Sequence, residues 1–281
     1  MLPLLHSELF RLARRWMPRV LLAILFAIVG VLYLLFWTVM QTGSETSSDI
    51  QDLRENLRLA AVRDTGLSLV FQVGAVDVII LTSSLIGAEF GWGTIRTLLP
   101  RARSREALLA AKTVTALLFV VVTVVTGTVV AFGASAFVTA VEDLPRGLGP
   151  DGVVRTLAAI GRTIYAMVPY AALALMITTW TRSVAAGIGV GLSVLFLEGL
   201  ILSILGAAGD VFDRVPGALI SRNVQTLLNA NGAGLDQRFS GGDGDLPPQW
   251  RAALVLGLYS AVFVAIAFQR FRSRDITAGG G

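Results

Sequence analysis

Six long apolar runs constrain this chain more than any other feature of its sequence. They lie at about 20–41, 67–88, 114–141, 157–180, 184–205 and 252–268. A helix needs roughly 20 mostly apolar residues to cross the hydrocarbon layer of a bilayer. The runs therefore predict an all-α membrane protein with six transmembrane helices, in which residues 1–281 form a single transmembrane domain.

The composition agrees with this fold class and excludes several kinds of chemistry. Of the 281 residues, 54% are hydrophobic and 15% are charged, whereas a soluble domain has roughly 25% charged residues. Cysteine is absent, which excludes disulfides, thiolate nucleophiles and cysteine-bound metals. His6 is the only histidine, so we expect no metal, catalytic or cofactor site. The first run is too long for a signal-peptide core, and we expect it to be retained.

The distribution of charge predicts the orientation. With six spans, 1–19, 89–113, 181–183 and 269–281 share one side and hold 13 basic residues against four acids. The other side holds ten basic residues against 13 acids. Basic loops stay inside, so we expect both termini in the cytoplasm of a multi-pass protein of the cell inner (plasma) membrane. The net charge of +4 then needs no nucleic acid as a partner. Arginine dominates over the single lysine, Lys112, which weakly indicates a bacterial source.

Two shorter helices are expected outside the spans. Before the first run, apolar residues recur every three or four positions, with Glu8, Arg11 and Arg15 opposite them. This pattern predicts an amphipathic helix at the membrane surface, with an elbow at Pro18; a short cytoplasmic helix of no special role is the alternative. In the external insertion 206–251, the stretch 217–229 predicts a short interfacial helix.

The cytoplasmic segment 89–113 is short and basic, and it is too small to form a domain. Its sequence is EFGWGTIRTLLPRARSREALLAAKT. Apolar residues at helical spacing predict a short helix over about 92–99, lying across the membrane surface. Ser104 has the side chain and position of an N-cap for a helix that begins at Arg105 and continues into the third span.

This segment resembles the corresponding part of the ABC transporter type-2 permeases. In that family an acidic residue precedes Gly-Thr-x-Arg, two leucines, a Ser-Arg pair and a lysine that enters the next span. The matching residues here are Glu89, Gly93, Thr94, Arg96, Leu98, Leu99, Arg103, Ser104, Arg105 and Lys112. The amphipathic first helix, the six spans and the long insertion before the last span agree with the family in layout.

The resemblance implies a transmembrane permease subunit of an ATP-driven ABC exporter. It implies two permease chains, as a homodimer or heterodimer, and two copies of a separate ABC ATPase subunit that binds ATP and Mg²⁺. The segment 89–113 would be the coupling helix and loop that dock on the ATPase, which gives Glu89, Gly93, Thr94, Arg96, Leu98, Leu99, Arg103 and Arg105 an ATPase-coupling role. The chain itself is not expected to be an enzyme, because a Walker A loop needs Gly-Lys-Ser/Thr and Lys112 follows Ala111. Arginines of this segment are also suited to binding anionic membrane lipid.

Three ionisable residues fall inside the apolar runs, where charge is costly and functional roles are common. Arg162 and Glu198 lie at depths that would let them form an ion pair, although Arg162 could instead reach to the outer interface. Asp77 lies near the middle of the second run. It could take part in transport, or it could be protonated and bonded to a hydroxyl such as that of Thr82.

Gly187, Gly189 and Gly191 superficially resemble a nucleotide-binding fingerprint but lie in a continuous apolar run. We expect Gly187 and Gly191 to serve close helix packing, within the chain more than across a dimer. Two other functions stay open for the whole protein: a proton-coupled secondary transporter using Asp77 or Glu198, and a non-transporting membrane scaffold.

Overall fold

The computed structural model describes residues 2–42, 48–91, 104–145, 147, 152–207, 218–232 and 246–273. Its α-helices are α1 (Leu2–Arg14), α2 (Trp16–Thr42), α3 (Ser48–Leu57), α4 (Thr65–Gly91), α6 (Arg105–Val141), α7 (Gly152–Thr181), α8 (Val184–Ala207), α9 (Ile220–Asn229) and α11 (Gln249–Ser273). A 3-10 helix, η1 (Leu59–Arg63), precedes α4. No strand occurs within the described ranges, and the predicted all-α class is confirmed.

Six helices are long and apolar enough to cross a membrane, as the sequence predicts. These segments span 16–42, 59–91, 105–141, 152–181, 184–201 and 249–273. Helices suit this environment because each satisfies its own backbone hydrogen bonds where no water is available. Most of them begin or end several residues outside the predicted apolar runs, since polar residues at their ends continue the helical hydrogen bonding.

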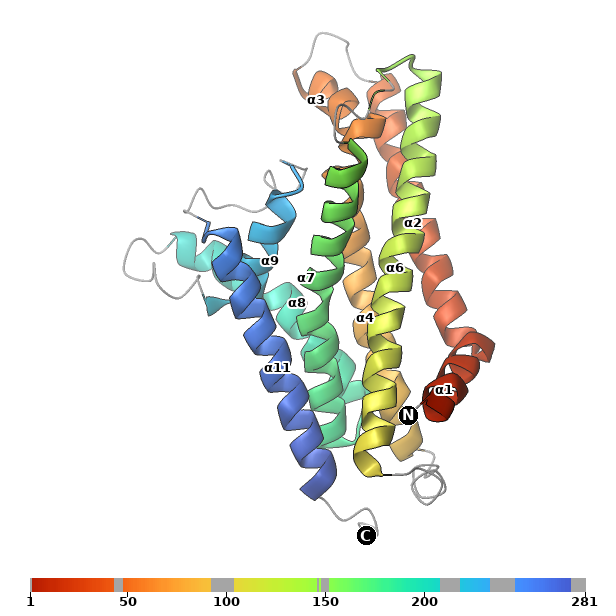
Figure 1. Cartoon of the computed structure of the whole chain (residues 1–281). Coiled ribbons are helices and arrows are strands. Elements are labelled where there is room, and N and C mark those ends of the chain that lie inside the picture. Colours follow the sequence, from red (N-terminus) through yellow and green to blue (C-terminus); the bar gives the residue numbers. More distant parts are fainter. Residues whose placement is uncertain are drawn as a thin grey trace.

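The helices form a bundle around α4 (Figure 1). In this view α4 runs behind α6 and α7, α2 flanks α6, and α11 lies beside α7. Most of α4 is buried, whereas α2, α8 and α11 keep long apolar faces exposed. Helix α1 and the last turn of α11 lie at one end of the bundle, named here the α1 end, and α3 and η1 lie at the opposite α3 end.

A separate helix precedes the first span, but its details differ from those expected. The chain turns at Arg15, between α1 and α2 (Figure 1). Pro18 lies in the first turn of α2, where its missing N–H leaves no helical bond unmade. The expected placement of Glu8 on the outward face is wrong, because its side chain is buried against α4 and α6 near cations.

The short helix expected in the external insertion is present as α9. It begins at Ile220 instead of 217 and buries Ile220, Val224, Leu227 and Leu228. Its neighbours are α11, α7 and α8. The helix therefore packs into the bundle with its apolar side and is not an isolated helix on the surface.

Two glycines of α8 allow close approach to α4 and α7, which confirms the predicted packing within the chain. A Cβ at Gly187 would lie 1.9 Å from Oγ1 of Thr178 and 2.6 Å from Oγ of Ser83. A Cβ at Gly191 would lie 2.6 Å from Cγ2 of Ile79. The small residues therefore set how closely α8 can approach its neighbours.

We predict that Gly187→Leu lowers the apparent unfolding temperature in detergent by roughly 5 °C or more, because overpacking a close contact costs about 1–3 kcal/mol or more. Gly189→Leu is the matched control in the same helix, because no atom lies within 4 Å of a Cβ built there. It should leave the unfolding temperature nearly unchanged. Equal losses in the two variants would contradict the packing assigned to Gly187.

Candidate functional site

A buried ion pair joins the two helices that flank the segment 92–103. Glu89 lies in the last turn of α4 and Lys112 in the third turn of α6. The Lys112 Nζ donates to Oε1 of Glu89 at 2.6 Å and to the carbonyl of Leu85 at 2.9 Å. Both side chains are almost completely buried, at 4% and 2% exposure. The first and last residues of the family-like pattern are thus in direct contact.

Helix α1 completes this cluster from a distant part of the sequence. Glu8 Oε2 lies 3.6 Å from Nζ of Lys112. Arg11 donates to Oε1 of Glu8 at 2.6 Å and lies 3.7 Å from Oε1 of Glu89. Glu8, Arg11, Glu89 and Lys112 are called the charge cluster below. It connects three helices, and its two acids and two bases balance in charge.

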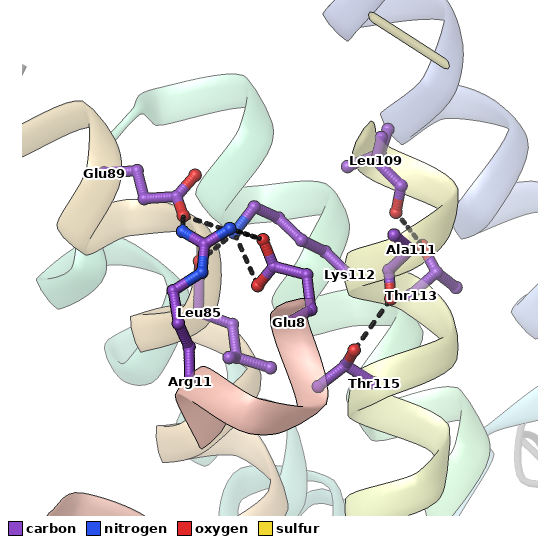
Figure 2. Close-up of polar contacts among 9 residues, drawn as sticks. All are labelled: Glu8, Arg11, Leu85, Glu89, Leu109, Ala111, Lys112, Thr113 and Thr115. Atoms are coloured by element: carbon purple, nitrogen blue, oxygen red, sulfur yellow. Dashed lines mark hydrogen bonds and ion pairs between the residues drawn. The ribbon is translucent and has the colours of Figure 1, made fainter. Parts of the chain in front are cut away.

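Figure 2 shows these four side chains converging between α1, α4 and α6. The nearby hydroxyls of Thr113 and Thr115 do not join them, because they donate to carbonyls of their own helix, those of Leu109 and Ala111. Lys112 is therefore neutralised by carboxylates and also donates to one backbone carbonyl. This arrangement makes the burial of an ammonium group tolerable, since a buried charge without partners costs several kcal/mol.

The cluster is not fully satisfied. Oε2 of Glu89 is buried and has no hydrogen-bond partner in the described part of the chain. Arg11 is about one-third exposed, so water can reach the cluster beside α1. The unbonded Oε2 of Glu89 can therefore accept another hydrogen bond, and such a change needs no further charge in the cluster.

The start of α6 agrees with the predicted cap. Ser104 has extended backbone angles, and its hydroxyl accepts the N–H of Ala107 at 3.0 Å. Arg105 is the first residue of α6 and is half-buried. The other residues assigned to coupling, Gly93, Thr94, Arg96, Leu98, Leu99 and Arg103, and the predicted helix at 92–99, lie outside the described residues.

Glu8 and Arg11 are the members of the cluster whose contacts sequence reasoning missed. Their spacing of three residues and their place on an amphipathic helix suggested an exposed polar face. A lone lysine entering an apolar span is the signal that could have revealed them, because a buried ammonium group needs an acidic partner and several hydrogen-bond acceptors. Among the residues that the structure describes, no three His, Cys, Asp or Glu side chains gather to hold a metal ion.

The predicted Arg162–Glu198 ion pair is wrong. Oε2 of Glu198 accepts the N–H of Ser221, in the first turn of α9, at 2.7 Å. Arg162 donates to the carbonyl of Ala230 at 2.7 Å and to the Asn231 side chain at 2.5 Å, at the other end of α9. The carboxylate thus meets the positive end of a helix dipole and the guanidinium meets its negative end. Sequence reasoning paired the two charges directly because it could not place α9 between them.

Asp77 is buried in α4 at 2% exposure. Its expected bond to Thr82 does not form, since the Thr82 hydroxyl and Oδ2 of Asp77 both lack a partner among the described residues. Thr82 lies five residues further along the helix, and this spacing places it on a different side of α4. Asp77 also takes no part in the charge cluster or in holding α9.

Comparison with known protein families shows to which family the chain belongs. A family model described as "Protein of unknown function (DUF2705)" matches residues 49–277. The chain belongs to the DUF2705 family. The DUF2705 match begins at α3 and runs through α11, and α1 and α2 lie outside it. A search of curated proteins found no match. The family description names no activity, so any function has to be argued from the site.

We predict that Glu89→Gln and Lys112→Met each destabilise the bundle by about 3 kcal/mol, because each leaves a buried charge without its partner. The double variant removes one charge of each sign and leaves the Glu8–Arg11 pair, which is 2.6 Å long. Its loss should be clearly smaller than the sum of the two single losses. Chemical unfolding in detergent measures all three, and additive losses would show that the two side chains do not interact.

We also predict that Arg162 holds α9 in place. Because the chain has no cysteine, Val224→Cys introduces a single thiol on the buried face of α9. Arg162→Met leaves two acceptors at the end of α9 unbonded, at a cost of about 1–3 kcal/mol. Labelling of the thiol by a maleimide should become about tenfold faster. Arg155→Met, which removes an exposed arginine of the same helix, should leave the rate unchanged, and equal rates in both variants would refute the anchoring role.

Proposed function

We propose that this chain is the membrane-spanning permease subunit of an ATP-driven ABC exporter. Two such chains would form the translocation path and would work with two copies of a separate ATPase subunit. The α1 end would face the cytoplasm in this arrangement, because the basic segments of the sequence are concentrated there. ATP and Mg²⁺ would be bound by the ATPase.

The observation that carries the proposal is the match of residues 89–112 to the coupling segment of type-2 permeases. The charge cluster supports it physically. Glu89 and Lys112, the two ends of this segment, are in contact at 2.6 Å, so a partner that displaces the segment acts on α4 and α6 together. Glu8 belongs to the same cluster, so displacement of the segment also acts on α1.

The burial of Glu89 refines its proposed role. Because its side chain is buried, it offers no surface to a docking partner, so it acts by positioning the segment instead of touching the ATPase. Direct contact would then fall to the central residues of the segment, Gly93, Thr94, Arg96, Leu98, Leu99 and Arg103. Arginine is suited to this task because its guanidinium can bind a carboxylate through two parallel hydrogen bonds.

We predict that the chain co-purifies in nanodiscs with an ABC ATPase encoded in the same operon. Arg96→Ala should lower ATP hydrolysis by the complex about tenfold or weaken its assembly, because a charged docking contact is worth about 1–3 kcal/mol. The unfolding temperature of the Arg96 variant should match that of the wild type, which separates docking from folding.

Arg251→Ala is the matched control, because Arg251 is an exposed arginine in the first turn of α11, far from the α1 end. It should leave both assembly and ATP hydrolysis unchanged. Failure to bind any ATPase, with transport by the chain alone down a proton gradient, would replace the proposal with a secondary transporter. Binding of an ATPase without any substrate-dependent turnover would indicate a scaffold.

A further inference from the structure

Asp77 is a deeply buried acid that neither the charge cluster nor the proposed coupling uses. Its Oδ2 atom lies in the interior of the bundle without a hydrogen-bond partner. The ion pairs among Glu8, Arg11, Glu89, Lys112, Glu106 and Arg272 do not include Asp77. Every other acid discussed above has a cation or a helix end beside it.

The register between α4 and α6 shows what surrounds Asp77. A Cβ at Gly127 would meet Val70 at 2.6 Å, a Cβ at Gly74 would meet Thr123 at 2.9 Å, and Lys112 bonds the carbonyl of Leu85. These contacts keep one antiparallel register along the whole interface, called the α4–α6 seam below. Asp77 therefore lies at the level of Val120, which is fully buried. Val120 offers the carboxyl no hydrogen-bonding group, and Thr123 of α6 lies one turn away at the level of Gly74.

The charged groups of the neighbouring helices are too distant or already engaged. Lys112 lies eight residues further along the seam, roughly 12 Å away, and it is bonded to Glu89. Helix α8 packs on the Ile79 side of α4, about 200° around the helix from Asp77, and its Glu198 is bonded to α9.

The remaining ionisable groups on the adjoining helices do not neutralise Asp77 either. On α7, the guanidinium of Arg162 is bonded at the end of α9. The ring of Tyr170 packs edge-on against Phe71, which lies about two turns before Asp77 in α4. On α2, the hydroxyl of Tyr33 lies near Gly66, three turns away. None of these groups is placed to balance a carboxylate at position 77.

We propose that Asp77 is a proton-binding site, and that in this conformation its carboxyl carries the proton. An unpaired carboxylate in an apolar interior is far less stable than the neutral acid. The ligand of this site is thus a proton, held between α4 and α6. This inference does not rest on the proposed function, since it concerns the charge state of one side chain in the folded chain.

The same geometry couples the proton to a movement. At 2% exposure the carboxyl meets little water in this conformation, so release of the proton requires a movement, and parting of the seam beside Val120 is the movement that we propose. An ionised Asp77 favours the parted seam, where it is hydrated, and the neutral acid favours the closed one. A higher pH therefore shifts the chain towards the parted state, and a lower pH towards the closed state.

Infrared spectroscopy tests the site directly, because a protonated carboxyl has a C=O band that a carboxylate lacks. At about pH 7 ordinary Asp and Glu side chains are ionised, so few carboxyls contribute to this band. The wild type in nanodiscs should show the band, and Asp77→Asn should lose it. Glu55→Gln, which removes an exposed acid of α3, should keep it.

Loss of a carboxylate band in Asp77→Asn, with the protonated band unchanged, would overturn the proposal. Isotopic labelling of all aspartate side-chain carboxyls in the wild type adds a test without a substitution, because it separates aspartate bands from glutamate bands. The protonated band should shift with the label and be lost in Asp77→Asn, and an unshifted band would assign the proton to a glutamate.

Transfer to heavy water tests the role of the seam. The band should shift slowly, as deuterium enters only when α4 and α6 part. Gly127→Ala pushes against Val70 in the seam and should accelerate the shift severalfold. Gly133→Ala, at a site of α6 with no atom within 4 Å of a Cβ, should not. An immediate shift in the wild type would show that the seam does not protect the proton.

Discussion

A polar group buried in an apolar bundle is costly unless it is bonded or neutralised, and this requirement determines how the charged side chains of the interior are arranged. The backbone meets this requirement by forming helices, and the ionisable side chains meet it in three different ways. Glu8, Arg11, Glu89 and Lys112 neutralise one another. Glu198 and Arg162 each use an end of α9. Asp77 has no such partner, and loss of its charge to a bound proton is the remaining solution. The arrangement of charge is therefore a consequence of the same constraint that selects helices in the first place.

The fold could be predicted from the sequence because its main signal is local. Twenty consecutive apolar residues specify a membrane helix with little help from the rest of the chain, and the Ser104 cap depends on residues three apart. The close packing at Gly187 was also predictable, because small residues spaced by four lie on one side of a helix. These features need no knowledge of which helices are neighbours.

Side-chain partners were harder to predict because they depend on tertiary contacts. Glu8 looked like a residue of a solvated face, and only the position of α1 beside α4 and α6 brings it to Lys112. Arg162 was paired with Glu198 only because the two residues were expected at similar depths in the membrane. Helix α9, which begins some 20 residues after Glu198, lies between them instead. The Asp77–Thr82 bond failed for a local reason, the helical spacing, which the sequence did contain. The DUF2705 match places the chain among relatives without adding a partner for any of these residues.

Helix α9 also links α7 and α8 at a distance from the turn that joins them. Helices α7 and α8 are joined at the α1 end by a turn of two residues that includes Arg182, with φ of 57°, and they diverge towards the other end (Figure 1). Arg162 lies roughly 29 Å along α7 from that turn and Glu198 roughly 21 Å along α8, and α9 joins these two points. Helix α9 thus connects α7 and α8 on the side where the two helices diverge. The angle between the two long helices can therefore widen only if α9 turns with them or releases one end, so a ten-residue helix limits the geometry of two much longer spans.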